Sequence, residues 1–170
     1  MPQRLAPPPM ENRPMRSEWL SIISTSFVAL IFTLFPHNEW YQQYAPQWLL
    51  LTVLYWCIQE PTRVGLIYAW FLGLVLDVGT VGLLGANALL FTLSAALVLG
   101  IRQMLFVTGP MQQALFIAGL SIVFLLLSLW MQGGIENGVT VLNYLARALS
   151  NLIAWPVMLL MFYLIRQRLS

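Results

Sequence analysis

The chain has few of the residues that build a soluble surface. It has no lysine and one aspartate, and 8 % of its residues are charged, against about 25 % in an ordinary soluble domain. Because 59 % of its 170 residues are hydrophobic, so few charges could not cover a soluble surface of this size. A soluble domain is therefore excluded, and the sequence predicts an all-α integral membrane protein.

Residues for catalysis and metal binding are equally scarce. Cys57 is the only cysteine and His37 the only histidine, which excludes an intramolecular disulfide and leaves no set of metal ligands. A chain without lysine also has no lysine-dependent phosphate loop, and its basic residues are too sparse for a nucleic-acid surface. We therefore expect no enzyme, no cofactor, no metal and no nucleic-acid partner.

What the chain has is apolar runs. A helix needs about 20 residues to span a bilayer. The second and third runs, at about residues 47–59 and 64–78, are shorter. They are separated by residues 59–63, whose Pro61 interrupts a helix, so we expect a hairpin of two short, shielded helices there. The prediction is a domain of six transmembrane helices over residues 17–168, preceded by a disordered, proline-rich cytoplasmic tail at residues 1–16. The apolar runs lie at about residues 19–35, 47–59, 64–78, 85–101, 111–131 and 149–165.

The arginines give this domain an orientation. Positive charge collects in cytoplasmic loops, and an inside N-terminus leaves Arg147 alone on the outer side. Both termini are then cytoplasmic, and Asp77 lies near the outer end of the third helix. The arginines on the cytoplasmic side are Arg4, Arg13, Arg16, Arg63, Arg102, Arg166 and Arg168.

Asp77 is the residue that most needs an explanation. It lies in the apolar, glycine-rich segment 71–85, and ionisable groups inside membranes are functional candidates by default. It could tie the turn after the third helix by accepting hydrogen bonds from loop N–H groups or from Asn87. It could instead face a partner or ligand, or pair with Arg147. Proton transport is disfavoured, because no span carries a second acid or a histidine.

Small residues recur every four positions on both sides of this turn, and Gly85 lies within the turn. Such stripes let helix backbones approach closely in membranes. We therefore expect the third and fourth helices to pack as an antiparallel pair with Asp77 at the outer end of their seam. The stripes are Gly65, Ala69, Gly73 and Asp77 on the third helix and Ala88, Thr92, Ala96 and Gly100 on the fourth.

The sixth helix carries a polar stripe of its own. Asn143, Arg147 and Asn151 recur at four-residue spacing, and we interpret them as facing a partner or lipid. Pro156 predicts a kink further along. Two functional classes remain, a scaffold for other membrane proteins and a small-molecule binder or transporter. A transporter needs polar residues near the bilayer midplane, and their scarcity favours the scaffold.

Several local motifs resemble those of one family. A proline opens the second helix at Pro46, and Pro61 lies in the turn that follows it. Gly73-Leu-Val-Leu-Asp77 is followed by Leu84-Gly85 and Ala88-Leu89, and Asn151 shortly precedes Trp155-Pro156. In their order and spacing, over roughly residues 17–168, these motifs resemble MreD, the rod shape-determining protein family of bacteria.

The resemblance implies a multi-pass protein of the bacterial inner membrane. It implies a non-enzymatic scaffold of the cell-elongation machinery that binds MreC and helps to regulate cell shape and lateral peptidoglycan synthesis. RodA, its penicillin-binding partner and membrane lipids are implied as further partners, with an indirect link to MreB. The family is also similar in fold to the six-helix substrate-binding subunits of energy-coupling-factor transporters. A vitamin-type substrate-binding or transport subunit therefore remains the alternative.

Overall fold

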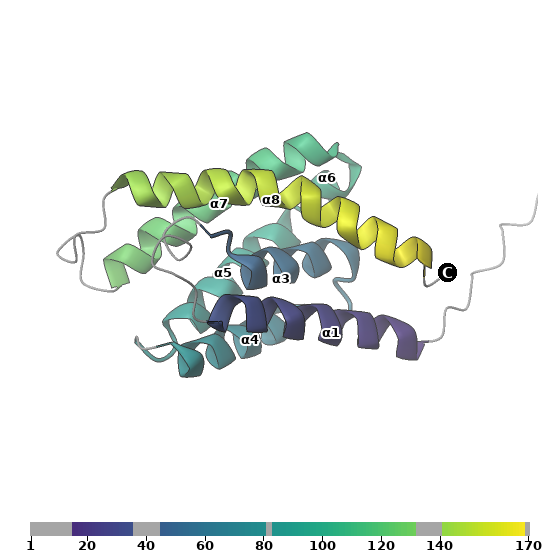
Figure 1. Ribbon diagram of the computed structural model, residues 1–170, viewed down its shortest axis with the longest axis horizontal. Coiled ribbons are helices and arrows are strands. Elements are labelled where there is room, and N and C mark those ends of the chain that lie inside the picture. The colour runs from purple at the N-terminus through teal and green to yellow at the C-terminus, as the bar shows by residue number, and fades with distance from the viewer. Residues whose placement is uncertain (1–14, 36–44, 81–82, 132–140, 169–170) are drawn as a thin grey trace, which may run out of the picture.

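The structure is a computed structural model that describes residues 15–35, 45–80, 83–131 and 141–168, and most of these residues lie in α-helices (Figure 1). The predicted tail at residues 1–16 lies almost wholly outside the described residues. In chain order the described helices are α1 (Met15–Leu34), α3 (Trp48–Gln59), α4 (Leu66–Gly79), α5 (Ala86–Gly100), α6 (Arg102–Val107), α7 (Pro110–Met131) and α8 (Val141–Arg168).

Each of the six apolar runs coincides with one helix, and the sequence did not predict the six-residue α6. By length and composition, two helical segments could cross a membrane, Pro110–Ser128 in α7 and Ala146–Leu164 in α8. The other apolar helical segments have 10–17 residues. The arrangement is consistent with a helical membrane protein.

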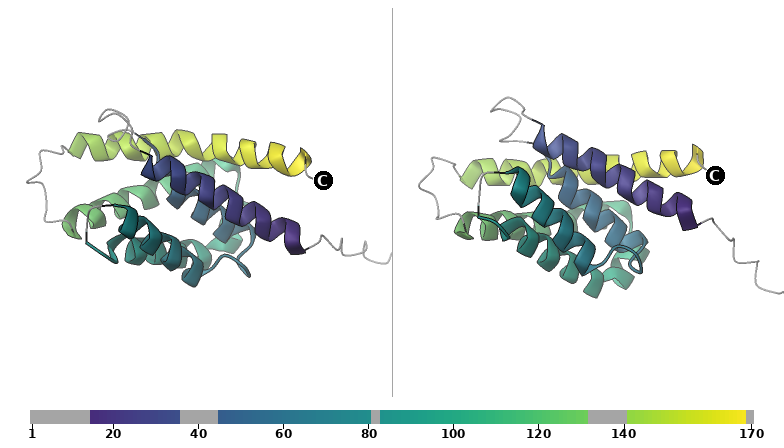
Figure 2. Two further views of the ribbon diagram at one scale, coloured as in Figure 1. Left: turned by 60° about the horizontal axis from the view of Figure 1, so that its bottom comes forward. Right: turned by 90° about the horizontal axis from the view of Figure 1, so that it is seen from below.

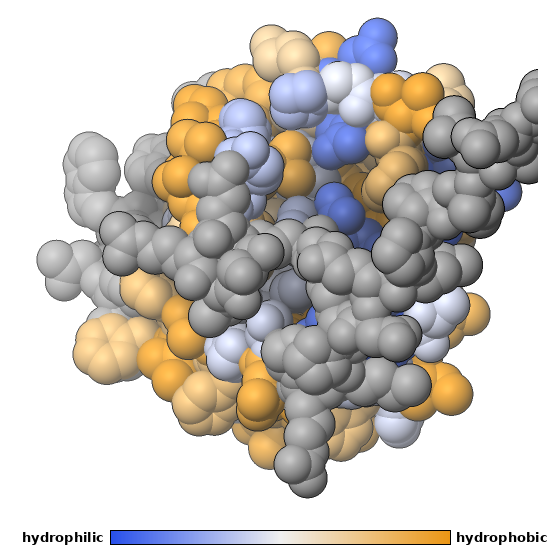
Figure 3. All heavy atoms as spheres, turned by 90° about the vertical axis from the view of Figure 1, so that its right-hand side faces the viewer, coloured by the Kyte–Doolittle hydropathy of each residue, from blue (hydrophilic) through white to orange (hydrophobic). Residues whose placement is uncertain are grey.

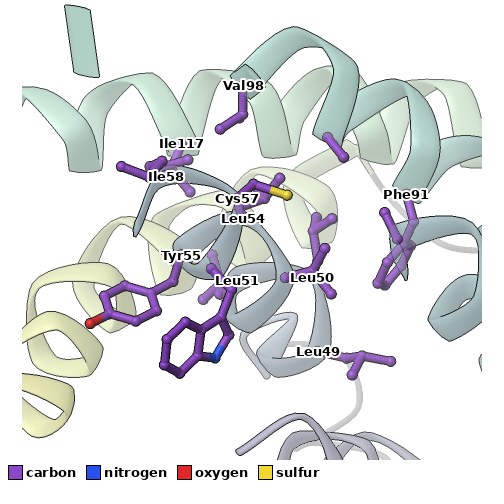
Figure 4. Packing of buried hydrophobic residues seen from close by; sticks show 14 of the residues in the cluster. Leu49, Leu50, Leu51, Leu54, Tyr55, Cys57, Ile58, Phe91, Val98 and Ile117 are labelled. Carbon is purple, nitrogen blue, oxygen red and sulfur yellow. The ribbon is translucent and has the colours of Figure 1, made fainter. Parts of the chain in front are cut away.

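Helix α3 forms the centre of the bundle. Its residues from Leu49 to Ile58 are all buried, as expected for a helix that is hydrophobic all round. It packs chiefly against α1 and α5, and the Tyr55 ring stacks on Phe162 of α8 with 4.4 Å between ring centroids. Figure 4 shows its side chains pointing outward in several directions, with Phe91 and Val98 of α5 and Ile117 of α7 around them.

The expectation of two shielded helices is correct for α3 and wrong for α4. Ile67 and Phe71 are 84 % and 56 % exposed, because α4 packs through its small residues on α5 and leaves its bulky face uncovered. Of the helices formed by the six apolar runs, the shortest, α3, therefore lies inside the bundle, and the next shortest, α4, lies at its surface.

Helix α8 packs along α7 and continues through Pro156 as one helix. Figure 1 shows it changing direction in its middle part, as expected where proline removes a backbone hydrogen bond. Its C-terminal end lies at the same end of the bundle as the start of α1 (Figures 1 and 2).

Two arginines connect neighbouring helices at that end of the bundle. Arg63, just before α4, forms an ion pair with Glu18 in the first turn of α1. Arg102 donates from Nε to the carbonyl oxygen of Ile58 at 2.8 Å, which satisfies one of the carbonyl groups left open at the C-terminal end of α3. Figure 3 shows this face, with hydrophilic residues near its centre and hydrophobic residues towards its edge.

Candidate functional site

The Asp77 carboxylate lies in the last turn of α4 and is bonded to the first turn of α5. Its Oδ2 accepts hydrogen bonds from the backbone N–H groups of Gly85 at 2.9 Å and Ala88 at 3.1 Å. Its Oδ1 accepts one from the N–H of Asn87 at 3.0 Å. The first N–H groups of a helix have no partner within that helix. Asp77, which is 5 % exposed, therefore caps α5 from the preceding helix.

Hydrogen bonds and helix dipoles act together on this carboxylate. Hydrogen bonds to a charged group contribute about 1.5–3 kcal/mol each, and the N-terminus of α5 adds the positive end of its dipole. The C-terminal end of α4 opposes the charge, but a helix dipole is worth only about 0.3–1 kcal/mol at such a position. Both oxygens are therefore held by backbone N–H groups at the start of α5.

The seam between α4 and α5 is closest at Gly73. A Cβ atom there would lie 2.5 Å from Cα of Ala88 and 2.7 Å from the carbonyl oxygen of Asn87, so no residue larger than glycine fits. Ala69 is fully buried one turn earlier. Gly85, the N-cap of α5, has φ of +95°, a left-handed conformation that favours glycine.

The inner half of the predicted seam is wrong. Ala96 and Gly100 are exposed, and added Cβ atoms at Gly65 and Gly100 would meet nothing within 4 Å. Thr92 is half-buried and donates its hydroxyl to the carbonyl of Ala88 at 2.7 Å. Helix α5 also packs on α3 and α7, and this second contact turns a different face inward. That face carries the buried residues Phe91, Ala95 and Val98.

Asn151 is also placed differently from its prediction. It is fully buried rather than facing lipid or a partner. Its Oδ1 accepts the Gln47 N–H at 2.8 Å, and its Nδ2 donates to Gln47 Oε1 at 3.4 Å. A buried amide needs partners, and the start of α3 offers an N–H group that its own helix cannot satisfy. Arg147 is half-buried, and the side chain of Asn143 lies outside the described residues.

Two hydroxyl groups tie α1 to its neighbours. Thr25 Oγ1 accepts a hydrogen bond from Trp56 Nε1 of α3 at 3.0 Å. Ser26 Oγ accepts one from the Tyr68 hydroxyl of α4 at 2.8 Å. No sequence motif pointed to these roles for Thr25 or Gln47. Thr25 and Ser26 lie three or four residues from Ile22 and Ala29, which are buried. Helical spacing therefore places the two hydroxyl groups on the buried side of α1.

The described polar side chains thus act mainly inside the bundle. In the part of the chain that the structure describes, no three His, Cys, Asp or Glu residues gather as a metal site would require. Large apolar side chains cover the outer faces of α1, α4, α7 and α8. This arrangement suits contacts with lipid or with other apolar helices.

Comparison with known proteins gives concordant results. The model of the family described as rod shape-determining protein MreD matches residues 15–168. The rod shape-determining protein MreD of Haemophilus influenzae is 32 % identical over 77 residues, which cover 45 % of this chain and 48 % of that protein. The similarity thus spans about half the length of this curated relative. No solved structure matches the chain.

Proposed function

The chain belongs to the family of the rod shape-determining protein MreD, and from this premise we propose that it is a non-enzymatic scaffold of the bacterial cell-elongation machinery. Membership itself implies a rod shape-determining membrane protein. The proposal adds that the chain binds MreC and so helps to regulate cell shape and lateral peptidoglycan synthesis.

The proposal rests on where the described polar and apolar side chains lie in the bundle. The carboxylate of Asp77 and the amide of Asn151 are both bonded to backbone groups of neighbouring helices. These polar groups hold helices together, and the outer faces are left to apolar side chains. A protein with this distribution can act by presenting shaped apolar helix faces to partner helices, because such contacts depend on close packing.

We further propose six membrane spans in the inner membrane with both termini in the cytoplasm. The start of α1 and the C-terminal end of α8 lie at one end of the bundle (Figure 1). Arg63 and Arg102 belong to the same end, through Glu18 and Ile58. Arginine on one side of a membrane is the expected cytoplasmic signal, and this common end supports the orientation inferred from the sequence.

Partners beyond MreC are part of the same proposal. RodA and its penicillin-binding partner would bind directly or through MreC, MreB would be linked indirectly, and lipids would cover the remaining faces. A vitamin-type substrate-binding subunit is not favoured by family membership.

The test is extraction of the full chain from its own membranes followed by native mass spectrometry. A co-purifying MreC protein without a small ligand supports the scaffold. Co-purification of a vitamin-sized ligand and an ATPase module contradicts it. Recovery of the chain in normal amounts with no MreC bound to it also contradicts it. A periplasm-active reporter fused after Ser170 checks the topology, since its activity would exclude a cytoplasmic C-terminus.

A further inference from the structure

The six-residue helix α6 is held in one orientation against the C-terminal end of α3. At its start, Arg102 Nε donates to the carbonyl oxygen of Ile58 at 2.8 Å. At its end, the carbonyl oxygen of Leu105 accepts hydrogen bonds from Thr108 Oγ1 at 2.9 Å and Gln113 Nε2 at 2.7 Å. The Leu105 side chain is buried. A helix this short is not stable alone, so these contacts decide which of its faces points outward.

The outward face of α6 is apolar. Met104, Phe106 and Val107 are 72 %, 58 % and 86 % exposed. Met111, at the start of α7, is also exposed. Figure 1 shows α6 at the edge of the bundle, beside the beginning of α7. Large apolar side chains that lie together at a surface are unfavourable in water. This face therefore needs a cover of lipid or of protein.

The place of α6 in the chain sets its depth in the membrane. Only residues 108 and 109 separate α6 from Pro110, where the apolar segment Pro110–Ser128 of α7 begins. Two extended residues cover at most about 7 Å, so α6 cannot lie far from the end of that segment. Because this end belongs to the proposed cytoplasmic surface, α6 lies close to the lipid headgroups of the inner leaflet.

The charge of this region has one sign. Arg102 is the only charged residue among residues 78–135. Its guanidinium carbon lies 5.8 Å from the centre of the Phe106 ring, so the positive charge lies beside an exposed apolar side chain. The cytoplasmic surface of a membrane is negative because it contains anionic lipids, and a guanidinium group matches the geometry of phosphate. An anionic phospholipid therefore complements both the charge and the apolar face of α6.

A partner helix fits this face less well than lipid does. Six residues extend only about 9 Å, which is less than two turns of helix. Helices in membranes associate where small residues let their backbones approach closely. The outward face of α6 instead presents the bulky side chains of Met104, Phe106 and Val107, and flexible acyl chains can pack around such a surface.

We propose that α6 lies in the cytoplasmic headgroup region of the membrane, where its apolar face contacts acyl chains and Arg102 binds the phosphate of an anionic phospholipid. The inference rests on the proposed membrane topology. Because Nε is bonded to Ile58, the two terminal nitrogens of the guanidinium are the atoms that bind the phosphate. Arg102 then has two roles, since the same group satisfies a carbonyl at the end of α3.

Fluorescence quenching by brominated lipids tests the proposal on the full chain in vesicles. In a Cys57→Ala background, a bimane label is attached through Val107→Cys on α6 or through Leu126→Cys on the exposed side of α7. The vesicles mix phosphatidylglycerol with phosphatidylcholine, and in each sample only one of the two lipids carries bromine on its acyl chains. One arginine near an anionic surface should enrich the anionic lipid about two- to fivefold. We therefore expect stronger quenching of the Val107→Cys label by brominated phosphatidylglycerol, and equal quenching of the Leu126→Cys label by both lipids.

Salt and substitutions separate the effect of charge from that of apolar contact. High salt screens exposed charges and should reduce the preference for phosphatidylglycerol. Gln103 is an exposed neighbour of Arg102, so Gln103→Glu should reduce the preference and Gln103→Lys should increase it, while the bond to Ile58 is kept. Arg102→Gln should abolish the preference, and its Tm is measured as well because it also removes that bond. When both lipids are brominated, total quenching should be the same in all these variants.

Each other outcome has a defined meaning. Equal quenching of the Val107→Cys label by the two lipids, or a preference that survives Arg102→Gln, contradicts phosphate binding by Arg102. If a fully brominated membrane does not quench the Val107→Cys label, α6 faces the cytosol or another protein, and the inference is wrong while the membrane topology stands. If the Leu126→Cys label is not quenched either, α7 is not in the membrane, and the proposed topology fails together with the inference.

Discussion

Replacing Gly73 with alanine should push α4 and α5 apart. The new Cβ would lie 2.5 Å from Cα of Ala88, and ordinary contact begins at 3.4 Å, so the backbones must separate by about 0.9 Å at this point. Overpacking of this kind costs about 1–3 kcal/mol. The atoms in the way belong to the backbone of Asn87 and Ala88, so no side chain can rotate to relieve the clash.

The same displacement weakens the Asp77 cap. Its bonds to the N–H groups of Asn87 and Ala88 are 3.0 and 3.1 Å long, and a shift of this size stretches them beyond hydrogen-bonding distance. We therefore expect the total loss to reach at least the upper part of the overpacking range. With about 2–4 °C per kcal/mol for a chain of this size, Tm should fall by about 6–12 °C.

The assay is thermal unfolding of the purified protein in one mild detergent, compared with Gly119→Ala. Gly119 lies within α7, and a Cβ there meets nothing within 4 Å. Alanine should therefore leave stability unchanged or raise it by about 0.5–1 kcal/mol. Equal Tm values for Gly73→Ala and the wild type would refute the close seam, and a loss in Gly119→Ala would show that the assay does not report local packing.

Three further substitutions test the polar contacts. Asn151→Leu should lower stability by about 1–3 kcal/mol, because it removes a buried amide and leaves the partly buried N–H of Gln47 without its acceptor; an unchanged Tm would contradict this contact between α8 and the start of α3. Thr25→Val should cost about 1 kcal/mol by removing the acceptor of Trp56 Nε1, and tryptophan fluorescence together with Tm would check it. Asp77→Ala should reduce the amount of folded protein more than Asp77→Asn, which keeps one oxygen as an acceptor; normal abundance with lost complementation of cell shape would instead assign Asp77 to partner binding.

The positions of the helices follow from the sequence because apolar length is a local property. Each of the six apolar runs contains a helix, and the turn at Asp77 uses loop N–H groups, one of the alternatives that the residues leave open. The short α6 was not predicted. Its N-cap residue, Ile101, provides no side-chain cap that would indicate the start of a second helix.

The faces of the helices were harder to predict than their positions. Four-residue spacing identifies a stripe, but only the neighbouring helices decide whether that stripe is covered. Ala96 shares a stripe with Ala88, yet Ala88 is buried against Gly73 and Ala96 is exposed, because the core of α3 and α7 draws a different face of α5 inward. Asn151 was predicted to face lipid or a partner. Its actual partner, Gln47, lies 104 residues away in the chain, and four-residue spacing on α8 gives no indication of that contact.

The burial of α3 has a consequence for how the protein is made. At 12 residues and about 18 Å, this helix is too short to enter a bilayer as an independent span. Its contacts come from α1, synthesised before it, and from α5 and α8, synthesised after it. A chain inserted during synthesis must therefore hold α3 beside α1 until the later helices arrive. Substitutions at the α1–α3 contact should then expose the chain to membrane proteases during synthesis, before any partner is met.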